Sequence, residues 1–114
     1  PDNIEQTSAL ADRYNVKFIN AHIGGHEHIK AIKNSENHCI FADTSGMAST
    51  QNNVIEYAVN TVGSENIFWG TDTYSCAFQK GRIVFADIPE KDKENILFAN
   101  ALREFPQIAS CFEQ

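Results

Sequence analysis

Three apolar segments of this chain each run into a polar residue and then into a turn rich in Gly, Ser or Thr. Apolar runs of this kind, each followed by a stretch with helical character, are typical of buried parallel strands. Because α/β enzymes place their chemistry where such strands end, the polar residues at those ends are predicted to meet at one edge of a sheet. The segments are Phe18-Ile19-Asn20-Ala21-His22-Ile23-Gly24-Gly25, Cys39-Ile40-Phe41-Ala42-Asp43-Thr44-Ser45-Gly46 and Ile67-Phe68-Trp69-Gly70-Thr71-Asp72-Thr73.

Helical periodicity fills the stretches around these predicted strands. The third expected helix has the clearest 3.6-residue period and ends at Gly63, where a helix C′ glycine belongs. The strands are expected over residues 16–22, 38–43 and 66–70, and the helices up to Asn15, over 27–33, from Thr50 to Gly63, over 78–85 and from Asp87 to 104. The expected caps are Asp2 or Asn3, Thr50 and Asp87, and the residues expected to be buried by the last helix are Leu97, Ala101 and Phe105.

The order of these elements predicts an α/β fold of three parallel strands with flanking helices. A repeat of about 25 to 30 residues fits successive units of a (β/α) barrel, so we expect a partial TIM barrel. The 114 residues suffice for one small domain over 1–114. Three strands do not close a barrel. The outer strand edges are therefore expected to pair with a missing part of a longer chain, to pair with a second copy, or to border a small open sheet.

Composition and charge exclude some classes of binding partner. The net charge of −6, without a Lys/Arg cluster, argues against nucleic acid and anionic membranes as partners. No apolar run approaches the roughly 20 residues that a membrane span needs. Three widely spaced cysteines do not suggest a disulfide framework, so a reducing cytoplasm is predicted. The first residue is Pro1, which predicts a processed chain or an excerpt of a longer one.

Four pieces in order, the three strand-end segments and a tail from Gln79 to Ala101, resemble an amidohydrolase of the amidohydrolase-2 type. These are metal-dependent (β/α)8-barrel hydrolases and decarboxylases. The resemblance runs from near residue 15 to near residue 105, and it implies that His22, Asp43 and Asp72 end barrel strands six, seven and eight. It also implies a divalent metal, with zinc expected.

The resemblance implies specific roles for two of these residues. His22 would be a metal ligand or the acid/base that orients water, and Asp72 would bind the metal and accept the proton of that water. The HxH pair of strand one and the His of strand five in this family have no counterpart here. His26-Glu27-His28 has the HxH spacing but follows a Gly-Gly turn, so that role is not transferred to it.

Each candidate also has an interpretation without function. Asp72 is a candidate helix or turn cap, and His22 is a candidate interior histidine bonded to backbone. Asp43 would contact substrate or support the site, although an Asx turn is the favoured interpretation. His26 and Cys76 are further substrate-binding candidates, against a surface histidine and a loop-packing thiol. Gln79 and Arg82 are candidates for contact with substrate or a partner subunit, although solvated helix positions are the favoured interpretation.

Two main functional hypotheses follow. In the first, the chain is a segment of a metal-dependent hydrolase or decarboxylase that uses a metal-activated water on a small organic acid, amide or lactone. The segment alone is then expected to be inactive. In the second, it is a stand-alone truncated homologue that dimerises as a non-catalytic binding or structural module. A weaker third hypothesis is metal storage on His22, His26 and His28.

Overall fold

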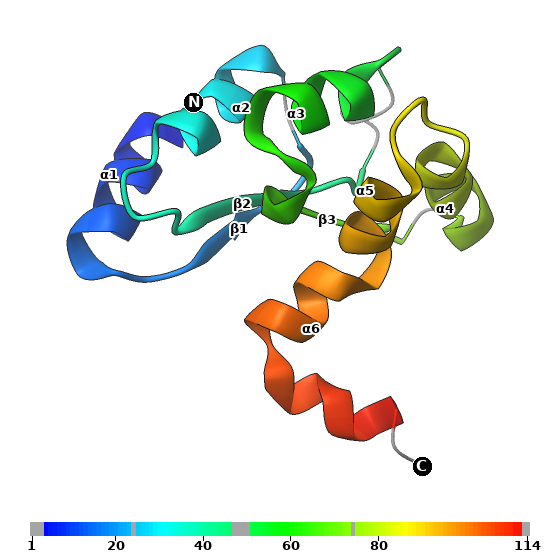
Figure 1. Ribbon diagram of the computed structural model, residues 1–114. Coiled ribbons are helices and arrows are strands. Elements are labelled where there is room, and N and C mark those ends of the chain that lie inside the picture. The colour runs from blue at the N-terminus through cyan, green and yellow to red at the C-terminus, as the bar shows by residue number, and fades with distance from the viewer. Residues whose placement is uncertain (1–3, 24, 47–50, 74, 113–114) are drawn as a thin grey trace.

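The computed structural model describes residues 4–23, 25–46, 51–73 and 75–112 (Figure 1). Helix, strand, helix, strand, helix, strand and terminal helices follow one another as predicted. The elements are α1 (Ile4–Tyr14), β1 (Phe18–Asn20), α2 (His26–Asn34), β2 (Ile40–Asp43), α3 (Val54–Val62), β3 (Ile67–Phe68), α4 (Cys76–Val84), α5 (Glu90–Glu94) and α6 (Asn100–Glu104). A 3-10 turn over Ser64–Asn66 precedes β3, a π-helical turn over Asn95–Ala99 joins α5 to α6, and a second 3-10 turn over Pro106–Phe112 follows α6. No helix of the described residues has the length and apolar character needed to cross a membrane.

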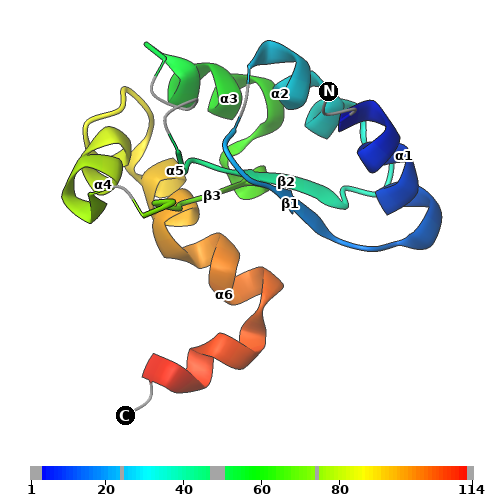
Figure 2. The same ribbon diagram turned by 180° about the vertical axis from the view of Figure 1, so that it is seen from behind.

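The strands form one parallel sheet in the order β1-β2-β3, with Phe18 opposite Ile40 and Ala42 opposite Ile67. Helices α1, α2 and α3 lie on one side of this sheet, and α6 with the C-terminal turn lies on the other (Figures 1 and 2). Alternation along the strands divides the side chains between these two layers. The three-stranded parallel α/β architecture predicted from the sequence is therefore confirmed.

Each face of the sheet has its own apolar cluster. On the side of α1 to α3, the sheet residues Ile40, Ala42 and Ile67 belong to a buried core that the helices complete. On the opposite face the rings of Phe41 and Phe68 meet edge to face at 5.5 Å, and Phe105 lies 6.1 Å from Phe68. The residue that follows α6 thus covers the second face, and both sides of β2 and β3 are buried.

Strand β1 differs from its prediction. The expected strand 16–22 shrinks to Phe18–Asn20, and the side chains of Phe18 and Ile19 remain 41% and 40% exposed. In the described residues β1 pairs with β2 alone, so it is the edge of the sheet. A continuous apolar run predicts burial on both faces, but β1 has a strand neighbour on one side only. Strand β3 also has one strand neighbour, and it is buried because the Asn95–Ala99 turn packs against it.

Two helix starts also differ. Helix α3 begins at Val54 behind Asn53, which has a φ of 57° and makes no side-chain cap hydrogen bond; Thr50 lies outside the described residues, as do Asp2 and Asn3. The Asp87 cap is wrong, because α5 begins at Glu90. The backbone N–H of Asp87 instead donates to Glu56 Oε1 at 2.9 Å. This bond ties the segment before α5 to α3.

The last predicted helix is continuous but contains the π-helical turn. The buried side chains around this turn are Asn95, Ile96 and Asn100, whereas Leu97, Ala101 and Phe105 are half-buried. A π-helical turn adds a residue to one turn, so it shifts the buried face away from a strict 3.6-residue period. Asn100 Nδ2 donates to the carbonyls of Ser64 and Ile67, each at 2.7 Å, and so fixes the helix to the start of β3.

Candidate active site at the ends of the strands

His22 lies two residues beyond β1 rather than at its end. Its φ of 61° is in the left-handed region, where non-glycine residues are uncommon. The backbone N–H donates to Asp43 Oδ1 at 3.0 Å, and the ring Nδ1 lies 3.1 Å from Ser45 Oγ. The unusual backbone thus turns both the N–H and the ring of His22 toward the end of β2.

Asp43 ends β2 and collects hydrogen bonds on one oxygen. Oδ1 accepts the backbone N–H of Ser45 at 2.9 Å and a short hydrogen bond from the Ser45 hydroxyl, in addition to the N–H of His22. The bond to the N–H two residues onward is the expected Asx turn. The bond to His22 is additional, because it joins the ends of two strands.

Asp72 follows β3 by four residues and completes the group. Its φ is 51° and that of Thr73 is 65°. Asp72 Oδ2 lies 3.7 Å from His22 Nε2, with side-chain exposures of 49% and 41%. The structure therefore brings the three polar strand ends, His22, Asp43 and Asp72, together at one edge of the sheet, within reach of solvent.

Two glycines permit this close approach. Gly46 has a φ of 69°, and a Cβ at this position would lie 2.8 Å from His22 Cε1. A Cβ at Gly70 would lie 3.1 Å from Ser45 Cβ and 3.3 Å from Asp43 Cγ. Real Cβ contacts are rarely this short, so the imidazole ring is seated directly on the backbone of Gly46.

Helix α4 supports the turn beneath the ring. Gln79 is fully buried, and its Nε2 donates to the Gly46 carbonyl at 3.5 Å. Arg82 Nη1 donates to the Thr44 carbonyl at 3.2 Å and to Gln79 Oε1 at 2.8 Å. Burial lowers the pKa of the Arg82 guanidinium. The expectation of a solvated position is wrong for Gln79, whereas Arg82 is half-buried. The i, i+3 spacing indicates that the two side chains can meet, but it gives no signal of burial.

The two remaining substrate-binding candidates, His26 and Cys76, are the first residues of α2 and α4. The His26 ring lies 4.3 Å from that of Tyr57, at the contact between α2 and α3, and His26 is exposed. Cys76 is exposed and is the first residue of α4, behind the Ser75 cap. Among the described residues no group of three or more His, Cys, Asp or Glu is arranged to hold a metal ion. The metal-storage hypothesis on three histidines therefore has no support in the described part of the chain.

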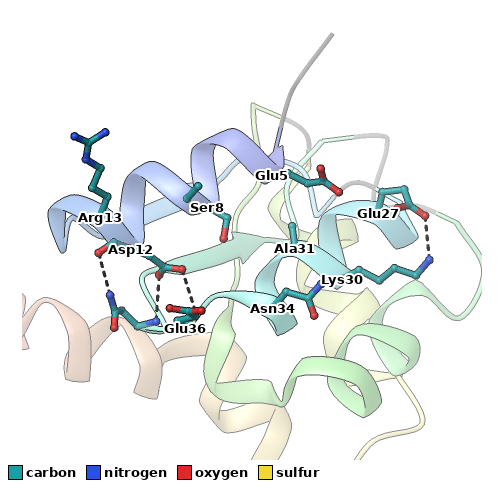
Figure 3. Close-up of a pocket in the computed structure, with 11 residues that line it drawn as sticks. Glu5, Ser8, Asp12, Arg13, Glu27, Lys30, Ala31, Asn34 and Glu36 are labelled. Carbon is teal, nitrogen blue, oxygen red and sulfur yellow. Dashed lines mark hydrogen bonds and ion pairs between the residues drawn. The ribbon is translucent and has the colours of Figure 1, made fainter.

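A pocket of about 580 Å³ lies elsewhere, between α1 and α2 (Figure 3). His22, Asp43 and Asp72 do not line it. The Asp12 carboxylate at its edge accepts from the Ser35 hydroxyl at 2.7 Å and from the N–H groups of Glu36 and Asn37. The Ser35 bond is the main cause that lowers the pKa of Asp12, assisted by the two N–H groups. These bonds fix α1 to the turn before β2, which is a structural role.

Parallel strands whose ends present His and Asp side chains beside one another are typical of α/β enzymes. The sequence model of the amidohydrolase family, of the amidohydrolase-2 type, matches residues 1–107, and the chain belongs to that family. No curated protein matches it. The crystal structure of the 5-carboxyvanillate decarboxylase LigW from Sphingomonas paucimobilis is similar in fold, with a TM-score of 0.67 at 22% identity. The match covers 87% of this chain and 36% of that decarboxylase chain, so this chain is a partial TIM barrel that spans about a third of the length of that protein.

Proposed function

We propose that this chain is the C-terminal segment of a metal-dependent amidohydrolase-like hydrolase or decarboxylase, carrying barrel strands six to eight. The observation that carries the proposal is the approach of His22 Nε2 to Asp72 Oδ2, at 3.7 Å, on the edge where the strands end. Catalytic groups of (β/α) barrels lie on this edge. The family match supports the reaction class, and the substrate would be a small organic acid, amide or lactone.

The residues present fit part of a divalent metal site. Imidazole nitrogen and carboxylate oxygen are ligands that zinc accepts, and here one of each faces the other in a partly exposed position. His22 and Asp72 would hold the metal, and the ligands beyond these two would come from barrel strands that this chain does not contain. Zinc is the proposed ion. Its chemistry, when bound, is to lower the pKa of a coordinated water to about 7.

The residues of the chain would divide the remaining tasks. The Asp72 carboxylate would accept the proton of the attacking water. His22 would serve in one of two ways, as a metal ligand through Nε2 or, where it is not a ligand, as the acid/base that holds or returns a proton at Nε2. Asp43 fixes the backbone of His22 through the bond to its N–H. Contacts of His26 and Cys76 with substrate stay predictions, as does a reducing, cytoplasmic setting for the free thiols of Cys39, Cys76 and Cys111.

Calorimetric titration of zinc into the 114-residue chain tests the proposed site. The Asp72→Asn variant should lose affinity by at least the roughly tenfold that removal of an outer-shell partner causes. Asp87→Asn, an exposed aspartate in the segment before α5, is the matched control and should bind as the wild type does. Affinity that survives Asp72→Asn but is lost in His26→Ala would replace this proposal with metal storage on histidines. The zinc-loaded chain alone is expected to turn over no lactone or amide, because most of the expected ligands are absent.

The exposed edge strand favours a second candidate, a non-catalytic module that pairs with a second copy or with a missing N-terminal part of the barrel. Phe18 and Ile19 present apolar side chains on β1, which has a single strand neighbour in the described residues. Light scattering at several concentrations, with Ile19→Lys as the comparison, separates the two. A dimer that the variant abolishes supports the module, and a monomer in both proteins contradicts pairing with a second copy.

A further inference from the structure

We infer that Ser45 and Asp43 hold the neutral ring of His22 in the tautomer that carries its proton on Nδ1, so that the lone pair of Nε2 faces Asp72. Ser45 is then a positioning residue of the site. That the Nε2 lone pair binds a metal rests on the proposed function. The tautomer itself follows from the hydrogen bonds of this chain.

The first step concerns Asp43 Oδ1. Two backbone N–H groups, those of His22 and Ser45, point at this oxygen from 3.0 and 2.9 Å. An N–H group can only donate, so Oδ1 is an acceptor in both bonds. The Ser45 hydroxyl makes a third, short contact with the same oxygen. The hydroxyl must therefore donate, because an ionised carboxylate oxygen can only accept.

The second step follows from the single hydrogen of a hydroxyl group. Since Ser45 gives its hydrogen to Asp43, only lone pairs of Oγ remain for His22 Nδ1, which lies 3.1 Å away. A hydrogen bond at that distance then requires the hydrogen to be on Nδ1. A neutral imidazole carries one N–H, and so Nε2 is the unprotonated nitrogen.

The third step concerns what Nε2 meets. Asp72 Oδ2 is 3.7 Å from Nε2, beyond the range of a direct N–H···O hydrogen bond. With the proton on Nδ1, both facing atoms carry lone pairs. A cation or a proton donor between Nε2 and Oδ2 would stabilise these two facing lone pairs. Histidines that bind metals usually donate the N–H of their other ring nitrogen to a fixed partner, as Nδ1 does here to Ser45.

The turn around Ser45 gives the ring little freedom to rotate away. Gly46 lies beneath the imidazole with no room for a Cβ, and the Gly46 carbonyl is held by the buried Gln79. Ser45 is itself 4% exposed. A buried hydroxyl between a carboxylate and a ring nitrogen can therefore select one tautomer, as an outer-shell partner does in metal sites.

Nitrogen NMR of the ¹⁵N-labelled 114-residue chain tests the tautomer, at a pH where the imidazole is neutral. Long-range proton–nitrogen spectra distinguish a protonated ring nitrogen from an unprotonated one, and the His22→Asn variant identifies the signal among the four histidines. The expected wild-type result is a protonated Nδ1 and an unprotonated Nε2. A wild-type ring with its proton mainly on Nε2 overturns the inference, whatever the variants do.

Variants add a second measurement. Ser45→Ala should lose the Nδ1–H signature, while Ser110→Ala, which removes an exposed hydroxyl in the C-terminal turn, should keep it. A Ser45→Ala spectrum unchanged from the wild type contradicts the role of Ser45. Zinc then separates the two proposals: added zinc should shift Nε2 more than Nδ1. If the wild type carries its proton on Nδ1 and zinc shifts neither ring nitrogen signal, the tautomer inference stands and the proposed metal site is wrong. If the proton is on Nε2 and zinc shifts the ring signals, the metal site stands and the tautomer inference is wrong.

Discussion

Replacing Gly46 by Ala should destabilise the chain, and the reason can be worked out from two features of the turn. The φ of 69° places this residue in the left-handed region, which costs a residue with a Cβ roughly 1–2 kcal/mol. The new Cβ would also lie 2.8 Å from Cε1 and 3.0 Å from Cγ of His22, so the ring or the turn must move. Overpacking of this kind costs roughly 1–3 kcal/mol. Together we expect a loss of about 2–5 kcal/mol in the free energy of unfolding.

Gly81→Ala is the matched control. Gly81 lies inside α4, and a Cβ there would meet its nearest heavy atom, in the Phe85 ring, at 4.0 Å, which is ordinary van der Waals contact. A glycine within a helix is less favourable than alanine by roughly 0.5–1 kcal/mol, so this variant should be more stable than the wild type. The same chemical change is therefore expected to have opposite signs at two sites.

Urea unfolding monitored by circular dichroism measures both variants, with free energies compared at a common slope. A Gly46→Ala variant within about 0.5 kcal/mol of the wild type would show that the ring is not seated on this turn, and the close approach of His22 to Gly46 would then be wrong. Equal destabilisation by both substitutions would show a general intolerance of added methyl groups rather than a specific contact with His22.

Three further predictions concern the scaffold. Asn100→Ala should lower the free energy of unfolding by roughly 2–4 kcal/mol, because it leaves two buried carbonyls without their shared donor, and exposed Asn60→Ala should change it by less than about 0.5 kcal/mol. The pKa of Glu104 is lowered, mainly by the hydrogen bond from Lys17. The stability that the ionised Glu104 side chain gives the folded chain is therefore present above its unfolded-state pKa and is lost as pH falls through its folded-state pKa. Between about pH 5 and 3 the melting temperature of the wild type should therefore fall more than that of Glu104→Gln, and parallel curves would contradict this. Ile19→Lys should leave the melting temperature of a monomer within about 2 °C of the wild type, since the side chain is 40% exposed, and a larger loss would indicate that β1 is covered in solution.

The sequence allowed the convergence of His22, Asp43 and Asp72 to be predicted, because it depends on chain order and parallel strands alone. The carboxyl ends of parallel neighbours lie on one edge whatever the details of packing. The part played by Ser45 could not be predicted in the same way. Its hydroxyl bridges to a ring that is 23 residues away in sequence, and the distance depends on the left-handed backbone of His22.

The residues whose burial was predicted wrongly have a similar explanation. The pattern of polar and apolar positions indicates which face of a segment is apolar, but not which other segment covers that face. Gln79 is predicted to be a surface residue of a short helix. It is fully buried instead, because its amide donates a hydrogen bond to the Gly46 carbonyl in the turn after β2. Phe18 is predicted to belong to the core but is 41% exposed. Both β1 and β3 have one strand neighbour in the described residues, but β3 is buried because the Asn95–Ala99 turn packs against it, with the Trp69 N–H donating to the Ile96 carbonyl. Both differences arise from the contacts between segments distant in the chain, which tertiary packing decides.

The geometry of the candidate site depends on the register of the three strands that carry it. His22, Asp43 and Asp72 belong to the ends of three different strands, and the bond from the His22 N–H to Asp43 joins the first to the second. Gly70, beside Ser45 and Asp43, brings the third strand end into contact with the second. A slip of either strand pair by one residue would turn each side chain to the other face, so the 3.7 Å approach of His22 to Asp72 requires both registers to be correct. Any ligand that binds between these two residues should therefore stabilise the whole three-stranded sheet, and protection of the β2 and β3 amides from hydrogen exchange should rise with zinc concentration.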